Sequence, residues 1–194
     1  MIQLLGTRTS PFVRRVRVVA HELGVAIELL DSTTEAGQVL EREWSPIRKI
    51  PVARFGDEVV LDSHTIIARL LALAGPAPDA GLRVDQSPWE LRVGHVIDGA
   101  LDAAINAFYL RKDGASATTL PYLGKQDERV DAALAWLAAN WRPQAFGVTE
   151  LAAITALDWM RYRAVRDVEA VPEFASLLAQ HADRPSLAST RPGA

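Results

Sequence analysis

The sequence predicts a mixed α/β domain followed by an all-helical domain. Strand-like and helix-like patterns alternate over residues 1–75, and every apolar pattern over residues 88–194 has helical spacing. The stretch between them, residues 76–87, is rich in proline, glycine and aspartate and predicts a linker. With 194 residues and 49% hydrophobic positions, the chain is long enough to form two small cores.

The first elements predict a βαβ unit. An apolar run at residues 2–5 precedes a glycine, as expected of a buried strand. Ser10 and Pro11 are the residue types preferred just before a helix and at its first position. Apolar residues then recur at helical spacing until Gly24 ends the helix, and residues 26–30 predict a second strand parallel to the first.

The rest of the first domain predicts a hairpin and two more helices. A weakly helical stretch at 33–44 is stopped by a Ser-Pro pair. Residues 50–55 and 58–61 flank a Gly-Asp turn and predict an antiparallel hairpin. An Asp-Ser pair then opens a helix over about 64–74. The order β-α-β-α-β-β-α predicts a four-stranded mixed sheet with helices on both faces.

The second domain predicts helices alone. Helical patterns run from 88 to about 112, from 122 to about 141, from 149 to about 165 and from 172 to about 182. A short terminal segment follows the last of these helices, after Arg184-Pro185. No strand pattern and no internal repeat interrupts them.

Composition excludes several kinds of chemistry. A formal net charge of −3 provides no strong positive field, so neither nucleic acid nor an anionic membrane is an expected partner. The sequence has no cysteine, which rules out disulfides, zinc–thiolate sites, iron–sulfur clusters and thiolate nucleophiles. Any sulfur chemistry must therefore use a thiol that a ligand supplies.

No targeting or membrane-spanning segment is evident. The N-terminus lacks a basic region followed by an apolar stretch and a cleavage site. The most apolar window, residues 66–75, is shorter than the roughly 20 residues that span a bilayer. We therefore expect a soluble, cytosolic protein.

Ser10 is the first candidate site residue, and it has two interpretations. As an N-cap it accepts a hydrogen bond from a backbone N–H, which stabilises a helix by about 1 kcal/mol. The same hydroxyl lies at the positive end of a helix, where an anion is favoured. A ligand thiolate that is hydrogen-bonded there would have a pKa below the ~8.5 of a free thiol. The neighbouring Thr9 could share this role.

Two other positions have the same ambiguity. A cis Ile50–Pro51 bond would turn the backbone of Ile50 outward to pair with an extended peptide, whereas an ordinary trans proline at a strand start would not. Asp62-Ser63 begins a helix whose N-terminus would suit a ligand carboxylate, or would simply be capped. Lys49 and Arg15 would add positive charge.

Together these sites resemble the glutathione S-transferase family. The resemblance is carried by the segments TSPFVRRVRVVAHELG and SPIRKIPVARFGDEVVLDSHTIIARLL, followed by an all-helical second half. It implies a thioredoxin-like N-terminal domain and an all-helical C-terminal domain. The Ser-Pro-Phe start is similar to that of serine-dependent, tau-like and related bacterial members, whereas omega-type members carry cysteine in place of Ser10.

The resemblance also implies roles for individual residues. Ser10 would hydrogen-bond the sulfur of glutathione, the pair Ile50 and cis-Pro51 would bind its cysteinyl backbone, and Asp62-Ser63 would hold its γ-glutamyl end. Phe12 and Lys49 are further expected contacts of the tripeptide.

Two helices of the second domain resemble family elements. The segment VTELAAITALDWMRYR resembles the family's buried helix, whose start carries a Ser/Thr-x-x-Asp capping box. Here the box positions are Gly147 and Glu150; glycine is a tolerable N-cap, and Glu150 can reach back to the cap N–H. The segment HVIDGALDAAINAFYLRK resembles the helix from which Asp98 would approach the amino group of glutathione across a dimer interface. For Asp98 and Asp102, the favoured interpretation is that of polar residues on a partly solvated helix face.

The second-substrate pocket is expected among the aromatic residues of the helical domain. The candidates are Phe108, Tyr109, Arg111 and Trp159, although aromatic residues at helical spacing also serve as core. The four histidines have no metal-ligand spacing, so no metal is expected.

The expected function is that of a homodimeric glutathione transferase that stabilises the thiolate of reduced glutathione and conjugates it to a small electrophile. Two alternatives remain open. The fold could serve as a non-catalytic binding or regulatory protein, or the same site could act as a glutathione-dependent peroxidase or isomerase. Candidate surface for the dimer includes Trp44, Trp89 and Val93.

Overall fold

The computed structural model describes residues 1–75, 81–84 and 87–193. Contacts divide the chain into two compact units: unit 1 is residues 1–82 with 181–194, and unit 2 is residues 83–180. The C-terminal segment 181–194 thus groups with the N-terminal unit, whereas the predicted second domain included it. The predicted linker, 76–87, lies partly outside the described residues.

Unit 1 has the predicted element order, with one short helix added from the C-terminal segment. Its elements are β1 (Ile2–Gly6), α1 (Pro11–Glu22), β2 (Ile27–Asp31), α2 (Glu35–Trp44), β3 (Val52–Phe55), β4 (Glu58–Leu61), α3 (Ser63–Ala74) and α8 (Pro185–Ala188).

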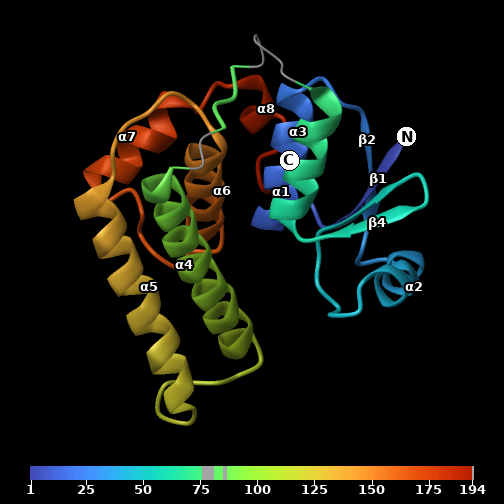
Figure 1. The fold of residues 1–194 in the computed structure, drawn as a ribbon. Coiled ribbons are helices and arrows are strands. Elements are labelled where there is room, and N and C mark those ends of the chain that lie inside the picture. Colours follow the sequence, from blue (N-terminus) through green and yellow to red (C-terminus); the bar gives the residue numbers. More distant parts are fainter. Residues whose placement is uncertain (76–80, 85–86, 194) are drawn as a thin grey trace. The chain divides into compact units, whose positions relative to one another are not determined.

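The four strands form one mixed sheet in the order β2-β1-β3-β4. Strand β1 pairs in parallel with β2 and antiparallel with β3, and β3 and β4 form the expected hairpin. Helices α1 and α3 pack against each other on one face of this sheet, and α2 lies on the other (Figure 1). The predicted α/β architecture with helices on both faces is confirmed.

Alternating side chains of the sheet build two apolar layers. Leu5 and Val52 are fully buried and pack with Trp44 at the end of α2. Leu4 and Ala53, one position away, are also fully buried; because successive side chains of a strand point to opposite faces, they lie on the side of α1 and α3. This burial on both faces explains why apolar residues stand next to each other in these strands, at Leu4-Leu5 and at Val52-Ala53.

A glycine permits α1 to approach the sheet closely. A Cβ atom at Gly6 would lie 2.3 Å from a methyl carbon of Val13, on the first turn of α1. Any larger residue at the end of β1 would displace that turn. Gly6 thus helps to set the position of the α1 N-terminus relative to the sheet.

Unit 2 contains α4 (Pro88–Lys112), α5 (Pro121–Asn140), α6 (Val148–Tyr162) and α7 (Pro172–Gln180). All residues from Glu150 to Met160 are buried, so α6 is enclosed on every side. Helices α4 and α7 pack against it, and α5 packs along α4. The predicted helices and the buried character of α6 are confirmed.

Candidate functional site

The register of the sheet brings three separate segments to one of its ends. Val52 pairs with Leu5 on one side and with Leu61 on the other. The chain positions just beyond this row are the turn that leads from β1 into α1, the Pro51 that precedes β3, and the Asp62 that follows β4. The three sequence motifs therefore lie together at the end of the sheet where α1 and α3 begin.

Ser10 is the N-cap of α1. Its backbone is extended, and its Oγ accepts a hydrogen bond of 3.3 Å from the Val13 N–H. The capping interpretation is thus confirmed, but it uses only one lone pair of the hydroxyl, whose O–H can still donate to an acceptor. The half-buried Ser10 accordingly presents a donor at the positive end of a twelve-residue helix. Thr9 lies in the turn immediately before it, also half-buried.

The C-terminal segment fixes α1 along its length. Near its start, the buried guanidinium of Arg14 donates to the Leu187 carbonyl at 3.2 Å and to the Thr190 hydroxyl at 3.3 Å. At its end, Arg184 binds both carboxylate oxygens of Glu22, at 2.8 and 2.7 Å. Residues 184–190 therefore support the helix that carries Ser10.

Glu22, Arg184 and Ser186 form a cluster that we call the Arg184 cluster. The Ser186 hydroxyl also donates to the Glu22 carboxylate. Burial opposes ionisation of Glu22, but the hydrogen bonds from Arg184 and Ser186 and the charge of Arg184 outweigh it and lower the pKa of this carboxyl. Sequence reasoning missed this cluster because Glu22 is more than 160 positions away from Arg184 and Ser186.

The loop between α2 and β3 contains a cis Ile50–Pro51 bond, the geometry that the resemblance implies. Ile50 is half-buried, Pro51 is buried, and Lys49 is exposed. Arg48 has a positive φ of 51°, which is uncommon for a residue with a side chain.

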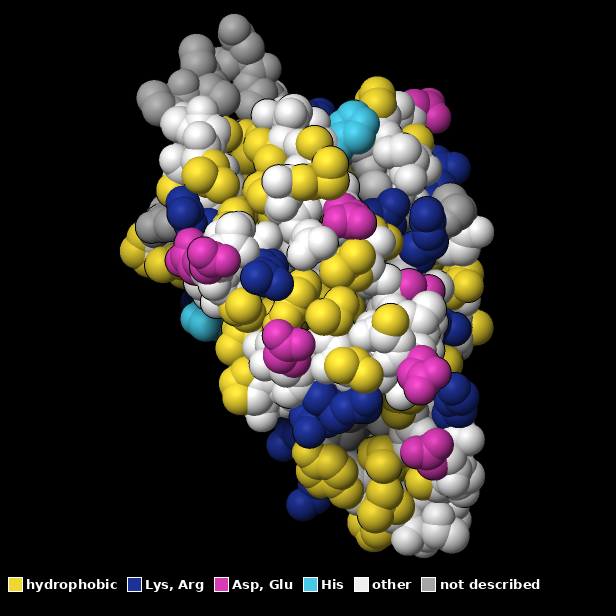
Figure 2. All heavy atoms as spheres, turned by 90° about the vertical axis from the view of Figure 1, so that its right-hand side faces the viewer, with side chains coloured by type: hydrophobic (Ala, Val, Ile, Leu, Met, Phe, Trp, Pro, Cys, Tyr) yellow, Lys and Arg dark blue, Asp and Glu magenta, His cyan; other side chains and the backbone are white. Residues whose placement is uncertain are grey.

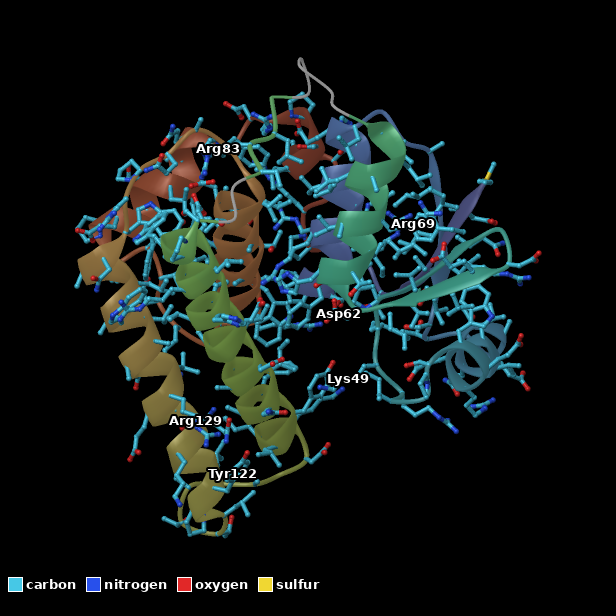
Figure 3. The ribbon with its side chains drawn as sticks, viewed as in Figure 1. Lys49, Asp62, Arg69, Arg83, Tyr122 and Arg129 are labelled. Carbon is cyan, nitrogen blue, oxygen red and sulfur yellow. The ribbon has the colours of Figure 1, made fainter. Side chains whose placement is uncertain are left out.

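Asp62 is the N-cap of α3. Its Oδ1 accepts hydrogen bonds from the N–H groups of His64 at 2.8 Å and Thr65 at 3.1 Å, and its φ of 69° lies in the left-handed region. The capping interpretation of Asp62-Ser63 is confirmed, with Asp62 as the cap and Ser63 as the first, buried helical residue. Figure 3 shows Asp62 where β4 passes into α3, and Lys49 on the loop before β3.

Phe12 and Arg15 contact each other rather than extend separately from α1. The guanidinium of Arg15 is buried and stacks over the half-buried ring of Phe12, with 5.0 Å to its centroid. Arg15 is thus buried rather than exposed, and its contribution of charge at the site stays a prediction.

Three of the four predicted second-substrate residues form one aromatic cluster in unit 2. The ring of Phe108 meets Tyr109 edge-on at 5.3 Å and Trp159 at 5.7 Å. Trp159 is buried, Phe108 is half-buried and Tyr109 is exposed. Arg163, which the sequence analysis did not single out, stacks on Phe108 at 5.1 Å. The cluster therefore places a cationic side chain next to an apolar aromatic surface.

Arg111 has a different set of contacts. Its guanidinium binds the Asp127 carboxylate at 2.5 Å, and Arg166 binds the same carboxylate at 3.1 Å. Burial opposes ionisation of Asp127, but hydrogen bonds from both arginines prevail and lower its pKa. Arg111 thus ties α4 to α5.

The backbone of Arg83 forms hydrogen bonds at the N-terminus of α6. The Arg83 carbonyl accepts from the Val148 N–H at 3.0 Å, and the Arg83 N–H donates to the Phe146 carbonyl at 2.8 Å. The capping box expected from Glu150 is not observed, because its carboxylate accepts from the Arg83 guanidinium at 3.0 and 3.1 Å instead. A Cβ at Gly147 would lie 2.7 Å from the Arg83 carbonyl oxygen, so glycine is required by this close approach.

Arg83 also binds a second buried carboxylate. Its guanidinium lies 2.5 Å from Glu90, and the carboxylates of Glu90 and Glu150 are only 3% and 1% exposed. We call these three residues the Arg83 cluster. Burial raises the pKa of Glu150, and the nearby Glu90 carboxylate adds to the rise. Sequence reasoning missed Arg83 because it lies in a segment without periodicity.

Two residues expected at a dimer surface belong to the cores instead. Trp44 packs with the sheet in unit 1, and Val93 is 1% exposed in unit 2. Trp89 is half-buried beneath the guanidinium of Arg142. Asp98 is half-buried and Asp102 is exposed on α4.

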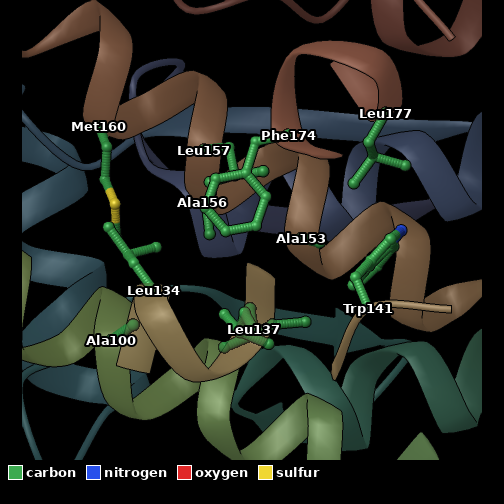
Figure 4. Close-up of a pocket in the computed structure, with 11 residues that line it drawn as sticks. Ala100, Leu134, Leu137, Trp141, Ala153, Ala156, Leu157, Met160, Phe174 and Leu177 are labelled. Carbon is green, nitrogen blue, oxygen red and sulfur yellow. The ribbon is translucent and has the colours of Figure 1, made fainter. Parts of the chain in front are cut away.

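Unit 2 also contains a small apolar cavity of about 10 Å³, room for about one water molecule (Figure 4). It is a gap among core side chains of α4 to α7 and includes none of the four predicted second-substrate residues. Its lining is Ile97, Ala100, Leu134, Leu137, Trp141, Ala153, Ala156, Leu157, Met160, Phe174 and Leu177.

The surface shows no segregation of charge on the face drawn in Figure 2, where acidic and basic side chains are interspersed. Within residues 1–75, 81–84 and 87–193, no group of three or more histidine, aspartate or glutamate side chains could hold a metal ion. No helix in that part of the chain is long and apolar enough to cross a bilayer.

Comparison with known proteins identifies the relatives of this chain. Residues 4–78 match the family described as glutathione S-transferase, N-terminal domain. An uncharacterised GST-like protein of Escherichia coli, YibF, is 24% identical over 98% of each chain. Glutathione S-transferase U1 of Arabidopsis thaliana is 36% identical over 67 residues, which are 34% of this chain and 30% of that protein.

Solved structures match the whole chain. A glutathione S-transferase from Methylobacterium radiotolerans, in complex with glutathione sulfonate, is 26% identical with a TM-score of 0.82 over 100% of this chain and 95% of that one. A glutathione transferase family member from Pseudomonas fluorescens with bound glutathione is 25% identical with a TM-score of 0.83 over 100% of both chains. Residues 4–78 therefore match the glutathione S-transferase N-terminal domain family, and the chain over its full length has the fold of solved glutathione transferases.

Proposed function

We propose that this protein is a glutathione transferase. The observation that carries the proposal is the N-terminus of α1, where the Ser10 hydroxyl caps the helix and can still donate its hydrogen. Relatives of the same fold have been crystallised with glutathione or glutathione sulfonate. In this proposal the thiol of glutathione loses its proton to solvent, and Ser10 stabilises the resulting thiolate with a hydrogen bond.

The other segments at this end of the sheet would hold the rest of the tripeptide. The backbone of Ile50 would pair with the cysteinyl residue, next to the cis-Pro51. The start of α3, with Asp62 and Ser63, would bind the γ-glutamyl end through its N–H groups and polar side chains. Lys49, Thr9 and Phe12 are proposed as further contacts.

The electrophile would bind against Phe108, Tyr109 and Trp159, with Arg111 nearby on α4. In the reaction, the thiolate sulfur forms a bond to an electrophilic carbon, and a leaving group departs with the electron pair of its own bond. We further propose that the protein acts as a cytosolic homodimer.

The test compares two serines in the same local context. Ser10 and Ser87 each precede a proline at the first position of a helix. The hydroxyl of each serine accepts a 3.3 Å hydrogen bond from the backbone N–H of the residue three positions later. Ser10→Ala should raise the pKa of the bound thiol and lower kcat/KM with a chloronitrobenzene by at least about tenfold. Ser87→Ala should cost a similar ~1 kcal/mol of stability but leave both quantities unchanged.

The readouts are ultraviolet titration of the bound thiolate, steady-state kinetics and thermal unfolding. An unchanged thiol pKa and unchanged turnover in Ser10→Ala would refute the role of Ser10. Glutathione binding without turnover of any electrophile would instead favour a binding or regulatory protein.

A further inference from the structure

Ser45, the residue that ends α2, makes three hydrogen bonds to the loop that follows it. Its side-chain Oγ–H donates to the Lys49 carbonyl at 3.0 Å, and the same oxygen accepts from the Lys49 N–H at 3.0 Å. Its backbone carbonyl accepts from the Arg48 N–H at 3.2 Å. One serine therefore closes the loop and fixes both polar groups of the Lys49 backbone.

The position of Ser45 is itself fixed by the core. The residue is fully buried, and its N–H donates to the Glu41 carbonyl at 2.9 Å in the last turn of α2. The preceding Trp44 is 5% exposed and packs with Leu5 and Val52. Since close-packed cores hold side chains in single positions, the hydroxyl is a rigid anchor for the loop.

The loop needs such an anchor. Arg48 adopts a left-handed backbone conformation that is unfavourable for a residue with a Cβ, so neighbouring bonds must hold it there. Beyond Lys49, the chain enters the sheet through the buried residues Pro51 and Val52. Ile50 thus lies between two fixed points, the Ser45 hydroxyl and the start of β3.

We propose that Ser45 is a positioning residue for glutathione binding, which holds the backbone of Ile50 in the orientation that pairs with the cysteinyl part of the tripeptide. This inference rests on the proposed function. Ser45 does not touch the ligand; it acts through Lys49. Its loss should weaken glutathione binding by increasing the mobility of residues 46–50, and should leave the chemistry at Ser10 intact.

If Ser45 only stabilised the end of α2, Ser45→Ala would still lower the stability of the protein. A matched control is therefore needed, and the other end of this helix provides one. The Thr34 hydroxyl donates to the Asp31 carbonyl at 2.9 Å and accepts from the Gly37 N–H at 3.0 Å. Thr34 and Ser45 therefore each donate one hydrogen bond and accept one at the two ends of α2. Only Ser45 contacts the loop.

The experiment compares Ser45→Ala, Ser45→Thr and Thr34→Ala by calorimetric titration with glutathione and by steady-state kinetics. Ser45→Ala removes both side-chain hydrogen bonds to Lys49 and should raise the Kd and the KM for glutathione roughly three- to tenfold, because the freed loop must be ordered again on binding. Its kcat at saturating glutathione should stay within about twofold, because no transition-state contact is removed. Thr34→Ala should lower the Tm similarly and leave KM unchanged, and Ser45→Thr should restore KM.

Hydrogen exchange provides a readout that does not depend on the ligand. Amides of residues 47–50 should exchange faster in Ser45→Ala but not in Thr34→Ala. If the unaltered protein fails to bind glutathione, the proposed function is wrong, and the exchange measurement still tests the anchor. If the unaltered protein binds and Ser45→Ala binds equally well, or Ser45→Thr is as impaired as Ser45→Ala, the positioning role is refuted.

Discussion

Each unit contains one arginine–glutamate cluster that stabilises it internally, and the two clusters differ in burial and in charge balance. In the Arg184 cluster one guanidinium meets the single carboxylate of Glu22, at 2.7 and 2.8 Å. In the Arg83 cluster one guanidinium meets the two carboxylates of Glu90 and Glu150. The same chemical groups therefore form a balanced pair in unit 1 and a site with excess negative charge in unit 2.

The pKa values of the carboxyls reflect this difference. In the Arg184 cluster the hydrogen bonds from Arg184 and Ser186 overcome the cost of burial, and the pKa of Glu22 is lowered. In the Arg83 cluster burial prevails, Glu90 adds repulsion, and the pKa of Glu150 is raised. The comparison shows that an ion pair stabilises a fold only to the extent that its partners neutralise one another after burial.

Among the changes that test this comparison, we expect removal of Arg83 to have the largest effect on the free energy of unfolding. Arg83→Met should lower the free energy of unfolding by about 3–5 kcal/mol, because two buried carboxylates lose their counter-charge. The measurement is urea unfolding at neutral pH. Arg69, whose partner Glu58 is exposed (53%), provides the control: Arg69→Met should change stability by less than about 0.5 kcal/mol. Equal effects at these two positions, both labelled in Figure 3, would contradict the assigned role.

The close approach of Arg83 to α6 predicts a smaller effect at Gly147. A Cβ there would lie 2.7 Å from the Arg83 carbonyl oxygen and 2.9 Å from the Glu150 carboxylate, so Gly147→Ala should destabilise the protein by about 1–3 kcal/mol. Gly99 lies within α4 with no atom within 4 Å of an added Cβ. Gly99→Ala should therefore stabilise the protein by roughly 0.5–1 kcal/mol. Thermal unfolding measures both, and a stabilising Gly147→Ala would show that Arg83 is not held in place.

The opposite shifts in the pKa values of Glu22 and Glu150 predict that their contributions to stability depend on pH in opposite ways. We expect these changes in stability to be the smallest of those predicted here. Because the pKa of Glu22 is lowered, its stabilisation is present above the usual carboxyl pKa of 4.5 and is lost as the pH falls through the folded-state value. Because the pKa of Glu150 is raised, its stabilisation is present below 4.5 and is lost as the pH rises through the folded-state value.

Two isosteric variants separate these contributions. Glu22→Gln should reduce the loss of stability on acidification, whereas Glu150→Gln should reduce the loss that accompanies a rise in pH from 4.5 towards neutrality. Urea unfolding over a pH series gives the dependence of the free energy of unfolding on pH for each variant. Identical pH profiles for the two variants would mean that the clusters do not differ as described.

The local parts of the fold could be predicted from the sequence. The Ser10-Pro11 start and the Gly24 end of α1 follow from capping preferences that act within a few residues. The end of α2 at a Ser-Pro pair follows from the restricted backbone before proline. The helices of unit 2 likewise follow from apolar periodicity, because burial of one face acts through residues three and four positions apart.

Other features required the tertiary structure. At the N-terminus of α6, Glu150 was expected to reach back to the N–H of the N-cap Gly147. Its carboxylate binds the Arg83 guanidinium instead, and the Arg83 carbonyl accepts from the Val148 N–H. Nothing near Ser45 in the sequence distinguishes it from an ordinary helix end, since its role depends on how the loop returns to β3. The same holds for Trp44 and Val93, which were candidates for the dimer surface and are buried.

Short-range sterics and backbone hydrogen bonding set the class of each unit, the helix ends and the position of the proposed thiolate donor, so local sequence is enough to predict them. Which charges meet depends instead on long-range packing. Arg184 lies 162 positions from Glu22, and Arg83 lies 67 positions from Glu150. Whether such a pair forms, and whether its burial lowers or raises a pKa, depends on the topology of the sheet and on the packing around α6.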